Sequence, residues 1–337
     1  MNSKHLLLAS AAILSLAACN KTVTEPVQSQ FPEDGVMRFT TNLVDPTIAT
    51  TRASITGSDV NQNGQQFQVK IVNPTSATYS YFNTVQFDGT EWTPVNRMLW
   101  QNDQQSITVT AAYKQGKAFS DYDFIVGANL TVAADQSTET KLKQQDLLTM
   151  PTKTIANPSI EETLMQNGKL VINFYHALTK LDVTLDLANE FYKVNPKLNN
   201  ASDITEFTIK GTNAGYQFKA TETANENYGT VTVTASTAAD ILANQSAFTA
   251  ANDADMHSYA TYEAIVVPQQ IAAGALTVSF KIGSRSFSWT NTEAYTLEQG
   301  KHYTLPLTVG HDTVTLNARA FSASSWEDQP GDNLGTE

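Results

Sequence analysis

The sequence predicts an all-β protein built from two β-sandwich domains with few short helices. Many short segments alternate apolar and polar residues with a period of two, turn residues separate them, and helical pattern is scarce. The charged fraction is only 16%, while Thr, Asn, Gln, Ser and Ala are abundant, a balance that suits an extracellular β protein. The chain of 337 residues is long enough for two domains with sizeable cores.

The first residues have the layout of a cleaved export signal. A short polar start precedes the apolar run Leu6–Leu16, and small residues lead to Cys19, the only cysteine. The run is too short to span a bilayer, which needs about 20 residues. The arrangement resembles a bacterial lipoprotein signal, which predicts a signal peptide at 1–18 and acylation (palmitate) of Cys19. An ordinary signal peptide with a chance cysteine, or a short membrane anchor, is the alternative.

The net charge argues against a nucleic-acid partner, and the cysteine content argues against stabilisation by disulfides. The formal net charge is -12, so no basic surface is expected to bind nucleic acid. With Cys19 acylated, the mature chain has no free thiol and no disulfide, so its stability must come from a large core.

The predicted elements follow a polar tether at 19–34. The first strand is Val36–Leu43, in which Met37, Phe39 and Leu43 point to one side and Arg38, Thr40 and Asn42 to the other. Similar alternation predicts strands at Phe67–Val72, Ser106–Tyr113, Leu170–Phe174, Leu181–Leu187, Phe207–Lys210, Thr230–Thr234, Ala264–Val267, Leu276–Ile282, Tyr303–Val309 and Thr313–Ala320. Short helices are expected within Thr140–Leu148 and Ala238–Ala250.

The domain boundary is expected near 157–168, because Pro151 and Pro158 interrupt the strand pattern and a new strand begins at Lys169. This division gives an N-terminal sandwich at 35–167, a C-terminal sandwich at 168–326 and a polar tail at 327–337.

Two segments resemble parts of metal-binding motifs. Residues 59–64 copy the first half of a calcium loop, but Lys70 stands where that loop needs a carboxylate, which favours a polar hairpin or loop. Residues 252–257 gather acidic side chains with His257, yet no second histidine lies at ligand spacing, which favours a solvated loop over a metal site.

Motifs typical of hydrolases, zinc proteases and phosphate-binding loops are missing from the sequence. The tryptophans are expected in the core, with a sugar-stacking platform as the alternative: Trp92, Trp100, Trp289 and Trp326. We therefore expect no catalytic residues, no bound metal and no cofactor.

Three segments in order resemble the fimbrillin-like proteins of type V pili, the lipoprotein pilins. Residues 173–183 (NFYHALTKLDV) resemble the family's F-x-H-x-L-x-K-(L/V) strand. Residues 264–270 (AIVVPQQ) resemble its apolar run before Pro-Gln, and residues 297–305 (LEQGKHYTL) its L-x-x-G-K-x-Y turn. Arg38-Phe39 and the later Thr51-Arg52-Ala53 have a spacing common near the start of these proteins. The resemblance implies two sandwiches of mainly transthyretin-like topology.

The resemblance also implies a mechanism of assembly. Such pilins are exported as lipidated precursors, an arginine-specific protease removes the first strand, and a strand from another subunit fills the exposed groove. Arg52, in a small and Thr-rich stretch, is the expected cleavage site, and the strand lost would be 36–43 with Met37, Phe39 and Leu43. Arg38 is the rival site, but it lies within the predicted strand. Alternatively Arg52 is an ordinary loop charge.

The donor strand is expected at 313–326, where Val314, Leu316, Ala318 and Ala320 share one parity. The same pattern suits the last fixed strand of the C-terminal sandwich, and the movable terminus is slightly preferred.

The sequence thus predicts a non-enzymatic fimbrial subunit that supports adhesion, first as an outer membrane-anchored precursor and then in a cell-surface fimbrium. Its expected partners are other fimbrial subunits in a homo- or hetero-polymer, the arginine-specific protease, the outer membrane through the lipid, and a host or bacterial surface ligand. The alternatives are a surface-anchored glycan- or protein-binding lipoprotein that stays monomeric and, less favoured, a secreted hydrolase.

Overall fold

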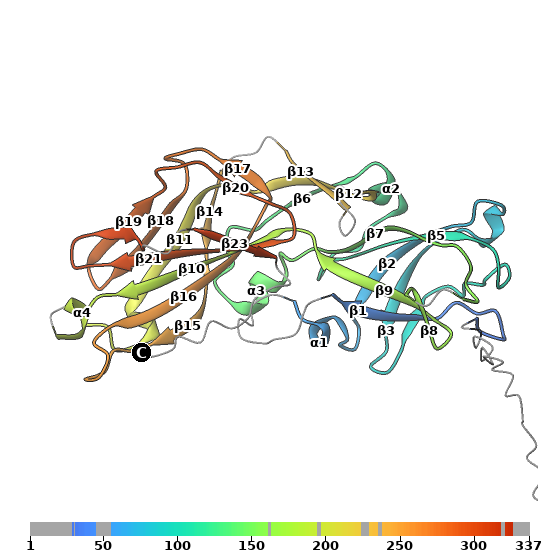
Figure 1. The fold of residues 1–337 in the computed structure, drawn as a ribbon, viewed down its shortest axis with the longest axis horizontal. Helices are drawn as coiled ribbons and strands as arrows, with labels where there is room; N and C mark the ends of the chain where they lie inside the picture. Colours follow the sequence, from blue (N-terminus) through green and yellow to red (C-terminus); the bar gives the residue numbers. More distant parts are fainter. Residues whose placement is uncertain are drawn as a thin grey trace, which may run out of the picture.

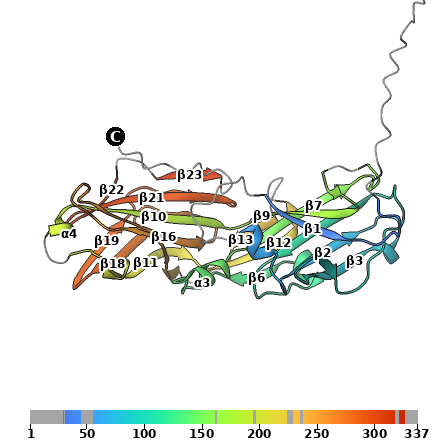
Figure 2. The ribbon, with the colours of Figure 1, turned by 90° about the horizontal axis from the view of Figure 1, so that it is seen from below.

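The computed structural model describes residues 29, 31–44, 55–160, 163–193, 197–223, 229–234, 238–317 and 321–325. Strands form most of the regular structure, and they build an elongated molecule with one group of sheets at each end of its long axis (Figure 1, Figure 2). The all-β prediction is confirmed. Among the described helices, none is long and apolar enough to cross a membrane.

The first sheet curves round on itself. Its strands follow the order β1-β4-β3-β2-β5-β7-β9-β8, and β1 also pairs with β9, so the path from β1 through β7 and β9 returns to β1. The strands are β1 (Phe39–Leu43), β2 (Gln66–Val72), β3 (Tyr81–Phe87), β4 (Trp92–Pro94), β5 (Ile107–Tyr113), β7 (Leu148–Ile155), β8 (Met165–Gln166) and β9 (Lys169–His176). Their inward side chains form one apolar cluster, which includes Phe67, Val69 and Val109 at 0% exposure.

Two further sheets face each other across the second apolar cluster. The larger has the order β15-β16-β10-β21-β22, with β23 also on β21, and the smaller has the order β14-β11-β18-β19. The strands are β10 (Thr179–Leu187), β11 (Ile204–Asn213), β14 (Ala238–Leu242), β15 (Asn244–Thr249), β16 (Ser258–Val266), β18 (Thr277–Ile282), β19 (Arg285–Thr290), β21 (Lys301–Val309), β22 (Val314–Leu316) and β23 (Ser322–Ser325).

A three-stranded sheet contains strands from both halves of the chain. It has the order β13-β12-β6, where β6 (Ala128–Thr131) comes from the first half and β12 (Gly215–Thr223) and β13 (Gly229–Val233) from the second. β17 (Gln269–Ile271) and β20 (Tyr295–Leu297) form a separate pair. This shared sheet lies between the two ends of the molecule (Figure 1).

The strand that begins at Lys169 pairs with the first sheet, not the second. β9 contacts β1, β7 and β8, whereas the next strand, β10, pairs with β16 and β21. The change of sheet occurs at Ala177 and Leu178, both fully buried. In terms of sheet pairing, the chain therefore passes from the first sheet to the second at Ala177 and Leu178, later than the boundary expected near 157–168.

The described helices are short, and three of the described α-helices begin at a capping side chain. They are α1 (Gly57–Val60), α2 (Asp121–Ile125), α3 (Glu139–Lys143) and α4 (Glu190–Lys193), with 3-10 turns η1 (Ala77–Tyr79) and η2 (Ala201–Asp203). Thr56 and Ser120 form capping boxes with Asp59 and Asp123.

One of the two helical predictions is wrong. α3 (Glu139–Lys143) overlaps the helix expected at 140–148, although β7 begins at Leu148. Residues 238–250, by contrast, form β14 and β15, each paired at the edge of a different sheet. Alanine-rich composition is a weak prior for helix, and pairing with β11 and β16 outweighs it.

Candidate functional site at the first strand

β1 occupies a gap between two strands of the first sheet. It runs parallel to β9 from Phe39↔Leu170 to Leu43↔Phe174, and Phe39 pairs antiparallel with Trp92 of β4. The preceding residues continue the ladder, because Met37 N donates to Met98 O at 3.0 Å and Trp100 N donates to Gly35 O at 2.9 Å. We call this gap, bounded by β9 and β4, the β1 seat.

Apolar side chains of β1 and of Met37, just before it, fill the floor of the seat. Met37 and Phe39 are each 1% exposed, and Leu43 is half-buried against the same cluster. The Phe39 ring meets Phe67 edge-on with centroids 6.1 Å apart, and Phe67 also contacts Phe174 at 5.5 Å. These are the three side chains for which the sequence pattern predicts an inward direction.

A polar residue on the inward side, Thr41, was missed by the sequence analysis. Its hydroxyl donates to Asn61 Oδ1 at 2.8 Å. Trp92 Nε1 lies 3.1 Å from the Thr41 hydroxyl and 2.8 Å from Asn61 Oδ1, so the indole N–H has two acceptors. We call Thr41, Asn61 and Trp92 the Thr41 network. Thr41 lies two residues from both Phe39 and Leu43, so the period-two alternation of the strand already places it on the inward side.

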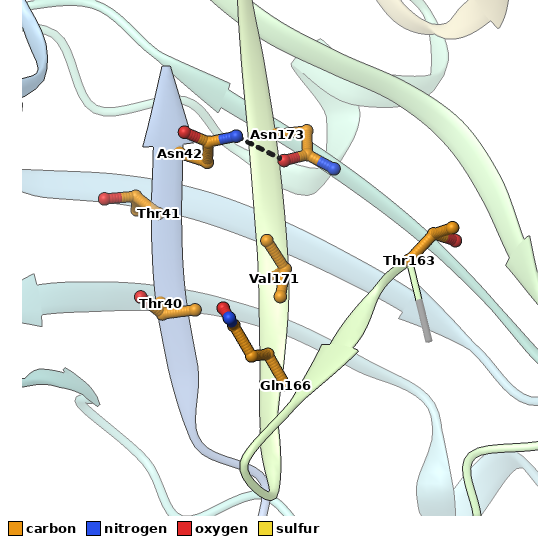
Figure 3. A pocket seen from close by; sticks show the side chains of 7 residues that line it. All are labelled: Thr40, Thr41, Asn42, Thr163, Gln166, Val171 and Asn173. Carbon is orange, nitrogen blue, oxygen red and sulfur yellow. Dashed lines mark hydrogen bonds between the residues drawn. The ribbon is translucent and has the colours of Figure 1, made fainter. Parts of the chain in front are cut away.

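The outer side of the β1–β9 seam is polar. Figure 3 shows Asn42 reaching across to Asn173, where its Nδ2 donates to Oδ1 at 3.2 Å, while Thr41 points away from β9. An open depression of about 400 Å³ lies over this seam. Its lining comes from β1, β9 and the β8 region: Thr40, Thr41, Asn42, Thr163, Gln166, Val171 and Asn173. The lining carries hydroxyls and amides but no ionisable side chain.

Arg38 is engaged at the start of β1 through both its main chain and its side chain. Its carbonyl accepts a hydrogen bond from Leu170 N at 2.7 Å. Its guanidinium donates to both carboxylate oxygens of Asp34, at 2.9 and 2.6 Å. This hydrogen-bonded pairing with Arg38 lowers the pKa of Asp34 well below its usual range.

The other predicted maturation residues, Cys19 and Arg52, lie outside the described residues, as do Ala318, Ala320 and Trp326. Val314 and Leu316 belong to β22, which pairs with Val309 and Leu307 of β21 at the edge of the sheet. Leu316 is 37% exposed, whereas Val314 is half-buried against the second apolar cluster.

The segments and tryptophans considered for metal or sugar binding have structural roles. Residues 59–64 form the end of α1 and a turn, with the Asp59 carboxylate bonded to Thr56 and Lys143. His257 pairs with Asp186 at 2.6 Å. Among the described residues, no group of three or more His, Cys, Asp or Glu side chains is placed to hold a metal ion. Trp92, Trp100 and Trp289 are buried, as the core interpretation predicts.

His176 and Lys180, two polar residues of the motif at 173–183, are buried with partners. His176 Nδ1 lies 2.8 Å from Asp146 Oδ2, and Lys180 Nζ lies 3.2 Å from Glu263 Oε1. Burial alone would lower the pKa of Lys180, but the neighbouring Asp182 and Glu263 carboxylates outweigh it, and the pKa is raised. The motif therefore supplies buried hydrogen-bonded pairs on consecutive strands of the two sheets.

The comparison with protein families agrees with this architecture. The model of the fimbrillin-like family matches residues 51–326. The chain belongs to the fimbrillin-like family. The match includes all three segments on which the resemblance was based, and it begins after β1.

Solved structures with the same fold include two proteins described as putative cell adhesion proteins. The one from Bacteroides uniformis ATCC 8492 has 16% sequence identity and a TM-score of 0.55, with 88% of this fimbrillin-like chain and 99% of that chain covered. The one from Bacteroides ovatus ATCC 8483 has 14% identity and a TM-score of 0.56, with 87% and 98% covered. At these identities the likeness shows the fold alone. A search of curated proteins gave no significant match.

Proposed function

We propose that this chain is a structural subunit of a cell-surface fimbrium that supports adhesion and has no catalytic role. It is exported as a lipoprotein precursor through Cys19, cut after Arg52 by an arginine-specific protease, and assembled by donor-strand exchange. Membership of the fimbrillin-like family and the fold shared with putative cell adhesion proteins support the role.

The observation that carries the proposal is the position of β1 between β9 and β4. Loss of β1 would leave main-chain groups of both neighbouring strands without their partners. It would also uncover the aromatic cluster around Phe67. A strand from another subunit supplies both the hydrogen bonds and the apolar side chains that such a gap needs.

Cutting the chain does not by itself empty the seat. Burial of Met37 and Phe39 contributes roughly 1.5–3 kcal/mol each, so the cut strand stays bound until another strand replaces it. The exchange then replaces one set of contacts by a similar set. Because the cut strand leaves only when another strand enters, the open form, which is prone to aggregate, stays rare and the exchange leads to assembly.

Arg38 and Arg52, the two arginines near β1, differ in how accessible they are expected to be to a protease. A protease binds an extended main chain, and the Arg38 main chain already pairs with β9 while its side chain is bound to Asp34. Arg52 follows β1 in a small, Thr-rich stretch, and a cut there leaves the whole of β1 without a covalent link to the rest of the fold. For this reason we assign the cleavage to Arg52.

The C-terminal segment 313–326 is the proposed donor to a neighbouring subunit. β22 lies at the edge of its sheet with Leu316 37% exposed, and β23 pairs with the same strand, β21. Release of the segment gives up both pairings and the ring contacts of Phe321, and insertion into a neighbouring groove would replace them. Val314, Leu316, Ala318 and Ala320 would be the inserted side chains.

Digestion of the purified chain with an arginine-specific protease tests the cleavage and the release of β1 together. A mass spectrum should show a cut after Arg52, and a labelled peptide of residues 35–44 should then enter the cut chain and displace its own fragment. Arg52→Lys, which such a protease spares, is the matched control and should take up no peptide. A chain that is cut at Arg38, or a cut chain that never exchanges its fragment, would contradict the proposal.

A further inference from the structure

The inward side chains of β1 and of Met37, two residues before it, form an ordered series in the seat. Met37, Phe39, Thr41 and Leu43 follow one another on the inward side as apolar, aromatic, hydroxyl and apolar groups. A replacement strand meets the same four positions, because side chains of a strand alternate with a fixed period of two. The seat is therefore selective about sequence and not merely apolar.

The second position is shaped for an aromatic ring. Phe39 is 1% exposed and packs edge-on against Phe67, which in turn contacts Trp92 at 4.9 Å and Phe174 at 5.5 Å. A smaller aliphatic side chain at this position would leave part of the space empty. Such underfilling is costly because the surrounding core relaxes only in part.

The third position is built for a hydroxyl. Thr41 Oγ1 donates to Asn61 Oδ1 and lies within hydrogen-bond distance of Trp92 Nε1. An alkyl side chain there would remove one of the two donors to Asn61 Oδ1, the other being Trp92 Nε1, and one of the two acceptors of the indole N–H. Polar groups that lose a partner on burial are penalised, and Trp92 is only 5% exposed.

The chain's own C-terminal strand does not carry this series. With the direction of β1, Val314, Leu316, Ala318 and Ala320 would take the four positions in order, and with the opposite direction they would take them in reverse. Neither direction supplies an aromatic ring or a hydroxyl. The other face of the segment is polar, with Thr313, Thr315, Asn317 and Arg319.

A shift in the register of the segment along the seat does not supply the series either. When Phe321 takes the aromatic position, its neighbours two residues away are Arg319 and Ala323, so one side is charged and no hydroxyl is supplied. Phe321 also has a place in its own sheet, where its ring lies 4.2 Å from that of Tyr295 and 5.2 Å from that of Tyr303. When Trp326 takes the position, its neighbours are Ser324 and Asp328, and the large apolar group is missing.

We propose that the β1 seat accepts a strand from a different subunit, with an apolar, an aromatic, a hydroxyl and an apolar residue at alternate positions. The chain's own segment 313–326 would then serve the groove of another protein, so the assembly is hetero-polymeric. This inference rests on the proposed exchange of β1 and assigns the class of partner to the same seat.

Peptide exchange into the full chain cut after Arg52 tests the inference. Labelled peptides of residues 35–44 and 312–326 compete for the seat, and displacement of the chain's own fragment is the readout. The 35–44 peptide should bind about 100-fold more tightly than the 312–326 peptide, and its Phe39→Leu and Thr41→Val forms should each lose about 10-fold.

A redesigned C-terminal peptide provides the converse test. Leu316→Phe with Ala318→Thr restores the series in the direction of β1 and should recover at least 10-fold in affinity, while Thr315→Phe with Asn317→Thr, on the other face, should not. Equal binding of the 35–44 and 312–326 peptides, or no gain from the redesign, would overturn the inference. Failure of the 35–44 peptide itself to exchange would instead show that β1 is fixed, which would refute the proposed function and the inference with it.

Discussion

The Ile55 amide donates a hydrogen bond to Asp146 Oδ2 at 3.3 Å, and both residues are buried. The same carboxylate oxygen lies 2.8 Å from His176 Nδ1, at the end of β9. Ile55 comes shortly after Arg52 in the sequence, so this bond ties the chain that remains after cleavage to the strand beside the seat. The retained part of the molecule thus has an anchor that does not depend on β1.

Removal of this anchor should destabilise the fold. Asp146→Ala leaves the Ile55 amide and His176 without their shared acceptor, and we expect the free energy of unfolding to fall by about 3 kcal/mol. Asp146→Asn, which keeps one acceptor oxygen, should cost less. Asp240→Ala, at an exposed ion pair with Lys210, is the control and should change the free energy by less than about 0.5 kcal/mol. Denaturant unfolding measures all three, and equal effects of the two alanine variants would refute the anchor.

In the uncut chain, the packing of Phe39 against Phe67 should contribute most of the free energy that binds β1 to the first sheet. Phe39→Ala removes a buried ring next to Phe67 and should lower the free energy of unfolding of the first sheet by about 3–5 kcal/mol. Thr40→Ala, on the outer side of the same strand, should cost well under 1 kcal/mol. Hydrogen exchange of the β9 amides in the two variants reports the loss locally. Similar protection in both would mean that β1 contributes little to the core.

How far the sequence predicts this site depends on whether a feature is local. The inward direction expected for Met37, Phe39 and Leu43 follows from alternation within one strand, a property visible in a few consecutive residues. The parallel pairing of β1 with β9 joins segments far apart in the chain, and no local pattern encodes it. For the same reason the pairing of β9 with the first sheet is not visible in its local pattern, nor is the link between Asn61 and Thr41.

The error at 238–250 has a related cause. Ala238, Ala239 and Ala243 favour a helix when the segment is considered alone. In the structure Ile241 is 1% exposed and pairs with Ile209 of β11, which fixes the strand. Tertiary pairing therefore decides the conformation of a segment whose own preference is weak.

Lys114 should make stability depend on pH in a defined window. Burial lowers its pKa from 10.5 to about 8, and its Nζ donates to Gln144 O at 2.6 Å. Between pH 8 and 10.5 the unfolded chain binds more protons than the folded chain, so this group raises stability as pH rises. Its penalty, roughly 3 kcal/mol by the size of the shift, is full below pH 8.

Comparison with Lys114→Met isolates this contribution. The wild-type melting temperature should rise relative to that of the variant as pH increases from about 8 to 10, since Met cannot lose a proton. Lys281→Met, at a half-exposed ion pair with Glu206, should show no such relative rise. A constant difference between wild type and Lys114→Met across this range would contradict the assignment.

The N-terminal residue of the chain in assembled fimbriae tests the removal of β1 most directly. Fimbriae sheared from cells can be dissociated, and the intact mass and N-terminal sequence of this subunit determined. The account predicts a chain that begins at Ala53 and lacks β1, with a strand of another subunit recovered in equal amount. A chain that begins at an acylated Cys19 and retains β1 within the fibre would contradict it.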